Sequence, residues 1–317
     1  MSTATRVPVR RRVRRTGTPT PTRRTRRRTD WWAVLMIAPA TLGLAVLYLW
    51  PFLETFLKSF KGNALFGPSK FVGVQNYSNL ISNDAFWHAL RNSMLYTALV
   101  LLGVPLAVVL AALIEQVTRG RTIYQVLFFL PVVTLPVAIG MVWRLILNGD
   151  FGLLNWVLSR LGIPGEYWVA DARLTIWAFA AVGIWMGLGI NLIMVLFISG
   201  VSAISPELYE AWALDGGGRA RQFRSITVPL LSPTIFFVVI LTVISALQMF
   251  DLVFIMLGSV NNTAIDGSKT IVYLFYEAAF VQFKQGYAAA IAVVLLMVIM
   301  AATAIQFRLQ RKWVVDV

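Results

Sequence analysis

The sequence predicts an all-α integral membrane protein with about six transmembrane helices. Of its 317 residues, 58% are hydrophobic and only 13% are charged, whereas soluble domains carry about 25% charged residues. Long apolar runs alternate with short polar segments, and about 20 apolar residues are needed to cross the ~30 Å hydrocarbon core of a bilayer. The expected spans cover about residues 32–52, 89–114, 124–147, 174–198, 231–256 and 287–307, within a membrane domain of residues 31–312.

Tryptophans and prolines mark the individual spans. Trp31, Trp32 and Trp50 flank the first apolar run, as expected of residues that sit at the membrane–water interface. Pro105 lies inside the second run and predicts a kink there. Prolines also interrupt the third run, and they do not argue against a helix because packed membrane helices tolerate them.

Positive charge is concentrated before the first span. Residues 1–30 hold eleven arginines and one acid, so +10 of the formal charge of +14 lies in this segment. With so few apolar side chains it is expected to be a disordered tail. Positive charge flanking a first span stays in the cytoplasm and attracts anionic membrane lipid. Nucleic-acid binding and a cleaved signal are the weaker readings, since no small-x-small cleavage site follows the apolar run.

This orientation places both chain ends on the cytoplasmic side of a bacterial cell (inner) membrane. Six spans return the C-terminal tail, residues 313–317, to the side of the N-terminus. Residues 199–230 then form a cytoplasmic loop, and the segments near 57–88, 148–173 and 257–286 lie outside.

Several chemistries are excluded by composition. The chain has no cysteine and one histidine, His88, so no disulfide, thiol catalysis or metal site is expected. It contains no recognisable acid–base pair and no Gly-x-x-x-x-Gly-Lys-Ser/Thr loop to hold nucleotide phosphates. We therefore expect no catalytic residues, no cofactor and no nucleotide site of its own; the protein is predicted not to be an enzyme.

The cytoplasmic loop contains a short predicted helix. Ser205 suits an N-cap, Pro206 the first helical position and Glu207 the positive end of the helix dipole. Three glycines, residues 216–218, are expected to end it, because glycine adopts the left-handed conformation of a sharp exit. Such a helix either lies on the bilayer surface or docks into a partner protein, and its residues alone leave both readings open.

A family resemblance bears on this choice. The sequence Glu210-Ala211-Trp212, three residues, Gly216, nine residues and Ile226-Thr227-Val228-Pro229 resembles the cytoplasmic "EAA" motif of binding-protein-dependent ABC importer permeases. The neighbouring Tyr209 and Asp215 resemble the carbohydrate branch, of the maltose and glycerol-phosphate type. Trp212 and Val228 depart from the common Ala and Leu but remain apolar. Residues 71–77, 276–280 and 286–290 also resemble such permeases, so the similarity covers roughly residues 30–312.

The resemblance implies a type I ABC importer permease fold and one half of a translocation pathway for a sugar or related solute. It implies as partners a second homologous permease, an ABC ATPase dimer and an extracellular or periplasmic solute-binding protein. In this family the short loop helix inserts into a cleft of the ATPase. The residues expected to couple to it are Glu207, Tyr209, Glu210, Ala211, Trp212, Asp215 and Gly216.

Polar groups inside apolar spans suggest a solute pathway or a contact between helices. A sugar site requires amides or carboxylates that match hydroxyl groups, and an aromatic surface on which a ring stacks; Phe250 is a candidate for that surface. The pathway candidates come from the fourth and fifth spans, where the family also places such sites: Trp185, Gly187, Asn191, Ser245, Gln248 and Asp251.

A secondary transporter or channel that acts without an ATPase is the alternative function. It predicts paired intramembrane charges for ion coupling or internal repeats within one chain. The sequence has few such charges and no evident repeat. The solute itself stays open between monosaccharides and oligosaccharides, polyols and glycerol phosphates.

Overall fold

The computed structural model describes residues 31–63, 69–117, 119–120, 123–124, 126, 134–190, 192–258 and 264–311. Helices dominate this part of the chain, and an isolated antiparallel bridge joins Lys61 to Phe71. The chain forms two compact units, Met1–Pro51 and Phe52–Val317, which are described separately. The predicted tails, residues 1–30 and 313–317, lie outside the described residues.

The first unit holds an apolar helix. It comprises α1 (Trp31–Leu44), the π-helical turn η1 (Ala45–Leu49) and the start of α2 (Trp50–Lys58). Val34–Lys58 is long and apolar enough to cross a membrane, and it overlaps the first predicted span. Inside α1, the Thr41 hydroxyl donates to backbone carbonyls three and four residues earlier.

Two further helices have the length and composition of membrane spans. One is the 32-residue stretch of α4 (Asp84–Leu101) and α5 (Gly103–Glu115), and the other is α18 (Gln285–Gln310). The first breaks briefly at Leu102. Pro105 has no N–H to donate to the carbonyl of Leu101, one turn earlier. The break at Leu102 therefore lies where this proline is expected to disturb the helix.

The remaining predicted spans correspond to shorter or bent helices. The third contains α7 (Pro136–Ile146), and the fourth contains α9 (Thr175–Ile190) and α10 (Leu192–Ser202). Among the described residues, three helices are long and apolar enough to cross a membrane. The bent pair Arg219–Leu230 and Ser232–Leu247 would make a fourth span if its two helices form one.

The fifth predicted span is interrupted. Helix α14 (Ser232–Leu247) ends before Gln248, and α15 (Asp251–Leu257) starts three residues later. The Thr270 hydroxyl, just before α17 (Ile271–Tyr276), donates to the Met249 carbonyl at 2.9 Å. A tertiary hydrogen bond therefore satisfies a backbone group that the broken helix leaves free.

Three apolar cores hold the second unit together. The first joins α4, α9 and α15 around Phe179 and Val253, both fully buried. The second joins α5, α10 and α14 around Phe197 and Val238. In the third, α3 (Gln75–Ile81) and α17 pack on α18, with Leu80 and Ile291 buried.

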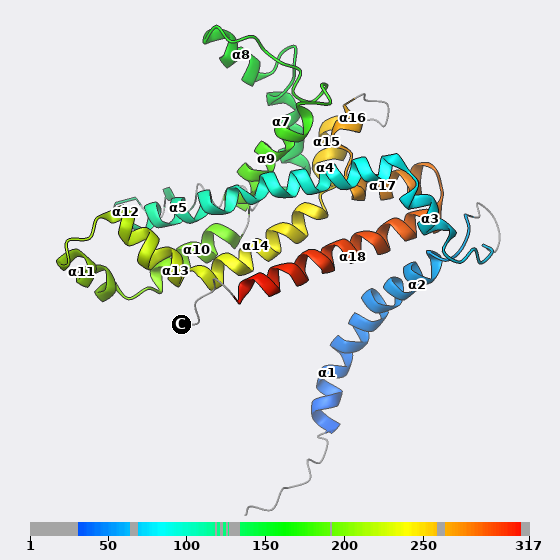
Figure 1. Ribbon diagram of the computed structural model, residues 1–317, viewed down its shortest axis with the longest axis horizontal. Coiled ribbons are helices and arrows are strands. Elements are labelled where there is room, and N and C mark those ends of the chain that lie inside the picture. The colour runs from blue at the N-terminus through cyan, green and yellow to red at the C-terminus, as the bar shows by residue number, and fades with distance from the viewer. Residues whose placement is uncertain are drawn as a thin grey trace, which may run out of the picture. The chain divides into compact units, whose positions relative to one another are not determined.

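Short helices connect these long ones. They include α8 (Leu153–Arg160), α16 (Ile265–Ser268) and the π-helical η3 (Glu277–Val281). Ile265 of α16 belongs to the first core, and Ala278 of η3 belongs to the third. The predicted cytoplasmic loop folds into α11 (Pro206–Leu214), α12 (Arg219–Gln222), the π-helical η2 (Phe223–Thr227) and α13 (Val228–Leu230). Figure 1 shows α11, α12 and α13 together at one end of α5 and α14.

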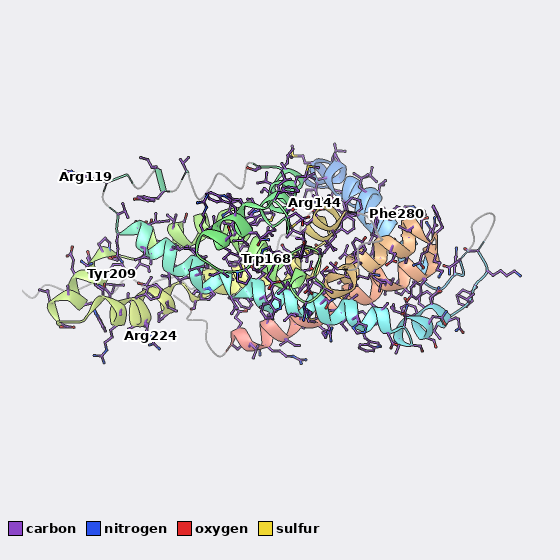
Figure 2. All side chains as sticks on the ribbon, turned by 90° about the horizontal axis from the view of Figure 1, so that it is seen from above. Arg119, Arg144, Trp168, Tyr209, Arg224 and Phe280 are labelled. Atoms are coloured by element: carbon purple, nitrogen blue, oxygen red, sulfur yellow. The ribbon has the colours of Figure 1, made fainter. Side chains whose placement is uncertain are left out.

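The predicted two sides of the membrane fall at opposite ends of the second unit. Arg119, Tyr209 and Arg224, expected in the cytoplasm, lie at one end, and Phe280, expected outside, lies at the other (Figure 2). A bend of 70° separates the loop from α14. The bend falls at Leu231, where Pro233 cannot donate to the carbonyl of Pro229.

Candidate functional site

The loop helix α11 starts at Pro206, as predicted. Proline at the first helical position has no N–H to leave unpaired, and Glu207 follows in the first turn. Ser205 occupies the N-cap position, but its side chain makes no capping hydrogen bond. Ser205 therefore occupies the predicted position without making the hydrogen bond of a serine cap. Pro206 and the acidic first turn are the features that favour a helix start here.

The end of α11 is a Schellman turn. The Gly217 N–H donates to the Trp212 carbonyl and the Gly216 N–H to the Ala213 carbonyl, both at 3.2 Å. Gly216 has φ +71°, whereas Gly218 has φ −69°. One glycine of the three thus supplies the left-handed conformation, which corrects the expectation that all three end the helix in this way.

Tyr209 ties α11 to the segment that leads back to the membrane. Its hydroxyl lies 3.1 Å from the hydroxyl of Thr227, which is buried in η2. The Gln222 side chain donates to the Tyr209 carbonyl at 3.3 Å. Tyr209 also packs against the core formed by α5, α10 and α14. These contacts connect α11 to η2, which continues through α13 into α14.

The other motif residues divide by exposure. Trp212 is half-buried, and its indole lies where a Cβ on Gly217 would have to sit. Leu208 and Leu214 are exposed apolar side chains at 46% and 89%. The motif residues that are free to meet a partner are Glu207, Glu210, Ala211, Asp215 and Gly216, all exposed.

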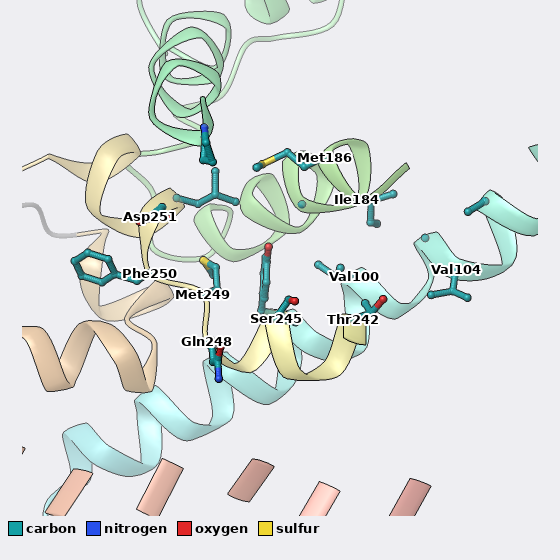
Figure 3. Close-up of a pocket in the computed structure, with 18 residues that line it drawn as sticks. Val100, Val104, Ile184, Met186, Thr242, Ser245, Gln248, Met249, Phe250 and Asp251 are labelled. Atoms are coloured by element: carbon teal, nitrogen blue, oxygen red, sulfur yellow. The ribbon is translucent and has the colours of Figure 1, made fainter. Parts of the chain in front are cut away.

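A second site is a cavity of about 270 Å³ where α14 breaks. Four of the six predicted pathway residues line it: Gly187, Ser245, Gln248 and Asp251. In Figure 3, Thr242, Ser245 and Gln248 follow one another along α14, with Asp251 beyond the break. Helices α4, α5 and α9 supply aliphatic walls that include Val100, Val104, Ile184 and Met186.

The other two pathway candidates lie elsewhere. Trp185 is not among the residues that line this cavity, and its ring packs edge-to-face on Trp143 at 5.4 Å between centroids. Asn191 lies outside the described residues. Phe250, the candidate aromatic surface, does line the cavity, and its ring stacks on Phe254 and packs against Tyr276, each at 5.2 Å between centroids.

The cavity includes two polar residues that sequence reasoning missed. Thr242 is 7% exposed, and its hydroxyl has no hydrogen-bond partner within the described part of the chain. Tyr96 is 5% exposed, and its hydroxyl lies so close to Gly183 that a Cβ there would overlap it. The spacing of Thr242, Ser245 and Gln248, three residues apart along α14 and its C-cap, is the signal that would have added the threonine.

Bundled apolar helices, a broken span lined by polar groups and an exposed loop helix define a membrane permease of the ABC importer class. The family described as "binding-protein-dependent transport system inner membrane component" matches residues 89–315. The chain belongs to this family. It is therefore a transmembrane permease of an ABC importer.

Curated relatives cover nearly the whole chain. The sn-glycerol-3-phosphate transport system permease protein UgpA of Agrobacterium fabrum is 30% identical over 282 residues, which is 88% of this chain and 94% of that protein. The arabinooligosaccharides transport system permease protein AraP of Bacillus subtilis is 31% identical over 279 residues, 87% of each chain.

The fold matches a solved transporter. A chain in the crystal structure of a bacterial alginate ABC transporter, in complex with an alginate pentasaccharide-bound periplasmic protein, aligns with a TM-score of 0.79. The alignment covers 89% of this chain and 95% of that chain at 20% identity. This confirms the predicted type I importer permease fold.

Proposed function

We propose that this permease forms half of the translocation pathway for a sugar or related small solute, beside a second, similar permease. ATP is hydrolysed by a separate ATPase pair, and a solute-binding protein delivers the solute from outside. The observation that carries the proposal is the loop helix α11, whose exposed motif face is held on the membrane domain by Tyr209 and Thr227. The relatives named for arabinooligosaccharides and for sn-glycerol 3-phosphate support a solute of this kind.

The exposed face of α11 is proposed to insert into a cleft of the ATPase. Exposed Leu208 and Leu214 supply apolar contact area, and exposed Glu207 and Glu210 supply charge for orientation. The half-buried Tyr209 and Trp212 have a different role, since their contacts fix the shape of the loop.

Movement of α11 reaches the cavity through α14. The pair Tyr209–Thr227 connects α11 to η2, and η2 continues through α13 into the start of α14. The far end of α14 carries Ser245, and Gln248 follows directly after the helix; both line the cavity. A chain of connected elements, α11, η2, α13 and α14, therefore joins the proposed ATPase contact to the proposed solute pathway.

The proposed location is the bacterial cell (inner) membrane, with both termini and α11 in the cytoplasm. The basic segment before the first span and the short basic C-terminus support this orientation. Membrane lipid surrounds the apolar helices, and the tail of residues 1–30 is proposed to contact anionic headgroups.

A co-purification experiment tests the coupling role. The chain is isolated from detergent-solubilised native membranes as wild type, Gly216→Asp and Glu210→Arg. We expect an ATPase and a second permease to accompany the wild type, and the ATPase to be lost from both variants while the chain stays folded. Glu166→Arg is the matched control, because it reverses an exposed acid in a segment proposed to lie outside.

The secondary-transporter alternative gives the opposite result. A chain that purifies alone and transports in liposomes without ATP would rule out the importer role. Loss of the ATPase from Glu166→Arg as well would show that the effect does not depend on the loop.

A further inference from the structure

The charge on the cavity wall has one sign. Asp251 is exposed to the cavity at the first position of α15, a favourable place for a carboxylate near a helix N-terminus. The described lining residues include no lysine, arginine or histidine. A carboxylate that faces a pathway within a membrane domain is costly unless it serves a function.

No cation on the packed neighbouring helices faces Asp251 in the described residues. Helix α7 packs against α15 and carries Arg144, but that guanidinium lies beside Gly258 and 3.5 Å from the Ile255 carbonyl, at the other end of α15. Lys269 is already paired with Glu277 at 2.8 Å. The negative charge therefore acts on the cavity contents.

The remaining polar groups suit an uncharged, hydroxyl-bearing solute. Thr242 offers a buried hydroxyl with no partner in the described part, and Ser245 and Gln248 are exposed to the cavity. Hydroxyl and amide groups both donate and accept, as sugar or polyol hydroxyls require. An anionic solute would instead require cationic groups such as arginine or lysine.

We propose that Asp251 makes this half of the pathway select against anions. The solute class is then an uncharged polyhydroxylated compound, with a cationic amino group tolerated, and not a phosphate ester or uronate. The proposed solute thus differs in charge from sn-glycerol 3-phosphate, the anion for which the UgpA relative is named. This inference rests on the proposed function, because it requires the cavity to belong to the pathway.

The absence of cysteine from the chain permits a direct test. Ser245→Cys places a single thiol at the cavity in the complete importer, assembled with its partners in membrane vesicles. Modification of this chain is followed with three methanethiosulfonate reagents: neutral hydroxyethyl, cationic trimethylammonium-ethyl and anionic sulfonatoethyl. Each rate is divided by the rate of the same reagent with free 2-mercaptoethanol.

We expect the cationic reagent to react about tenfold faster than the anionic one, because a single-sign cleft concentrates counter-ions by about tenfold or more. Adding Asp251→Asn should remove most of this preference, and adding Asp251→Lys should reverse it. Rates with the neutral reagent should be similar in all three proteins.

Two results would overturn the proposal in distinguishable ways. In the first, the neutral reagent modifies the Ser245→Cys thiol, but the charge preference is absent or is unaffected by Asp251→Asn. The selection role of Asp251 is then wrong, and the cavity can still belong to the pathway. If the neutral reagent does not react with or without ATP, the cavity is closed to water and the proposed pathway fails as well.

Discussion

The indole of Trp212 packs against the Cα of Gly217 across the turn that ends α11. A side chain at Gly217 would overlap the ring, and the Trp212 Nε1 is buried with no hydrogen-bond partner among the described residues. Trp212 is also the position at which the motif departs from the common alanine. The larger side chain is accommodated because residue 217 has none, so the two positions depend on each other.

Gly217→Ala should therefore displace Trp212 and weaken ATPase binding. Overpacking of this kind typically costs ~1–3 kcal/mol, and we expect a clear loss of co-purified ATPase. Gly218→Ala is the matched control, since a Cβ there meets nothing within 4 Å and φ is −69°. The double variant Trp212→Ala with Gly217→Ala should recover part of the loss, and equal loss in the two single-glycine variants would contradict this account.

Removing the hydroxyl of Tyr209 should loosen α11 from η2. The 3.1 Å contact with Thr227 is part-buried, and such a hydrogen bond contributes about 1 kcal/mol net. Tyr209→Phe and Thr227→Val should each raise ATP hydrolysis per solute transported, measured in proteoliposomes with all partners. The double variant should be no worse than either single one; additive effects would show that the two hydroxyls act separately.

The ion pair between Lys269 and Glu277 should stabilise the segment that precedes α18. The atoms are 2.8 Å apart and the side chains are 15% and 16% exposed. Removing one partner leaves a poorly hydrated charge, so Lys269→Met or Glu277→Gln should each lower the free energy of unfolding by about 2 kcal/mol, less than for a fully buried pair. Thermal unfolding in detergent measures this, and the double variant should be more stable than either single variant.

Asn155 should determine the rigidity of residues 148–168. Its side chain donates to the carbonyls of Gly149 and Glu166, and accepts from the Glu166 N–H and the Trp168 indole, at 2.8–3.2 Å. Asn155→Ala should increase the rate of tryptic cleavage at the exposed Arg160 several-fold and leave ATPase binding unchanged.

Ser159→Ala is the control for that experiment, because its hydroxyl bonds only the Trp156 carbonyl within the same helix. A cleavage rate for Asn155→Ala equal to that of the control would mean that apolar packing alone holds this segment.

Apolar runs coincide with the three described helices that are long and apolar enough to cross a membrane, and Pro105 lies one turn after the break at Leu102. The break at residues 248–250 could not be predicted in this way, since no proline or glycine is present there. It is held by a hydrogen bond from Thr270, a contact between distant parts of the chain. Local sequence carries no signal for such a bond.

The candidate sites were predicted unevenly for a related reason. Asp251, Ser245 and Gln248 stand out because polar groups are costly in apolar runs. Tyr96 and Thr242 do not stand out, because both side chains are common in membrane helices. The inward contacts of Tyr209 and Trp212 depend on η2 and on Gly217. The structure is therefore needed to tell which motif residues are exposed and which are buried.

The bend at Leu231 lies at one end of α14, and the cavity lies at the other end. Sixteen residues of α-helix span about 24 Å, so a 10° rotation at the Leu231 pivot displaces the cavity end by ~4 Å. A displacement of that size exceeds the length of a hydrogen bond, about 2.5–3.2 Å. We therefore expect small tilts imposed at the cytoplasmic end to open or close contacts around Gln248 while α14 itself stays folded.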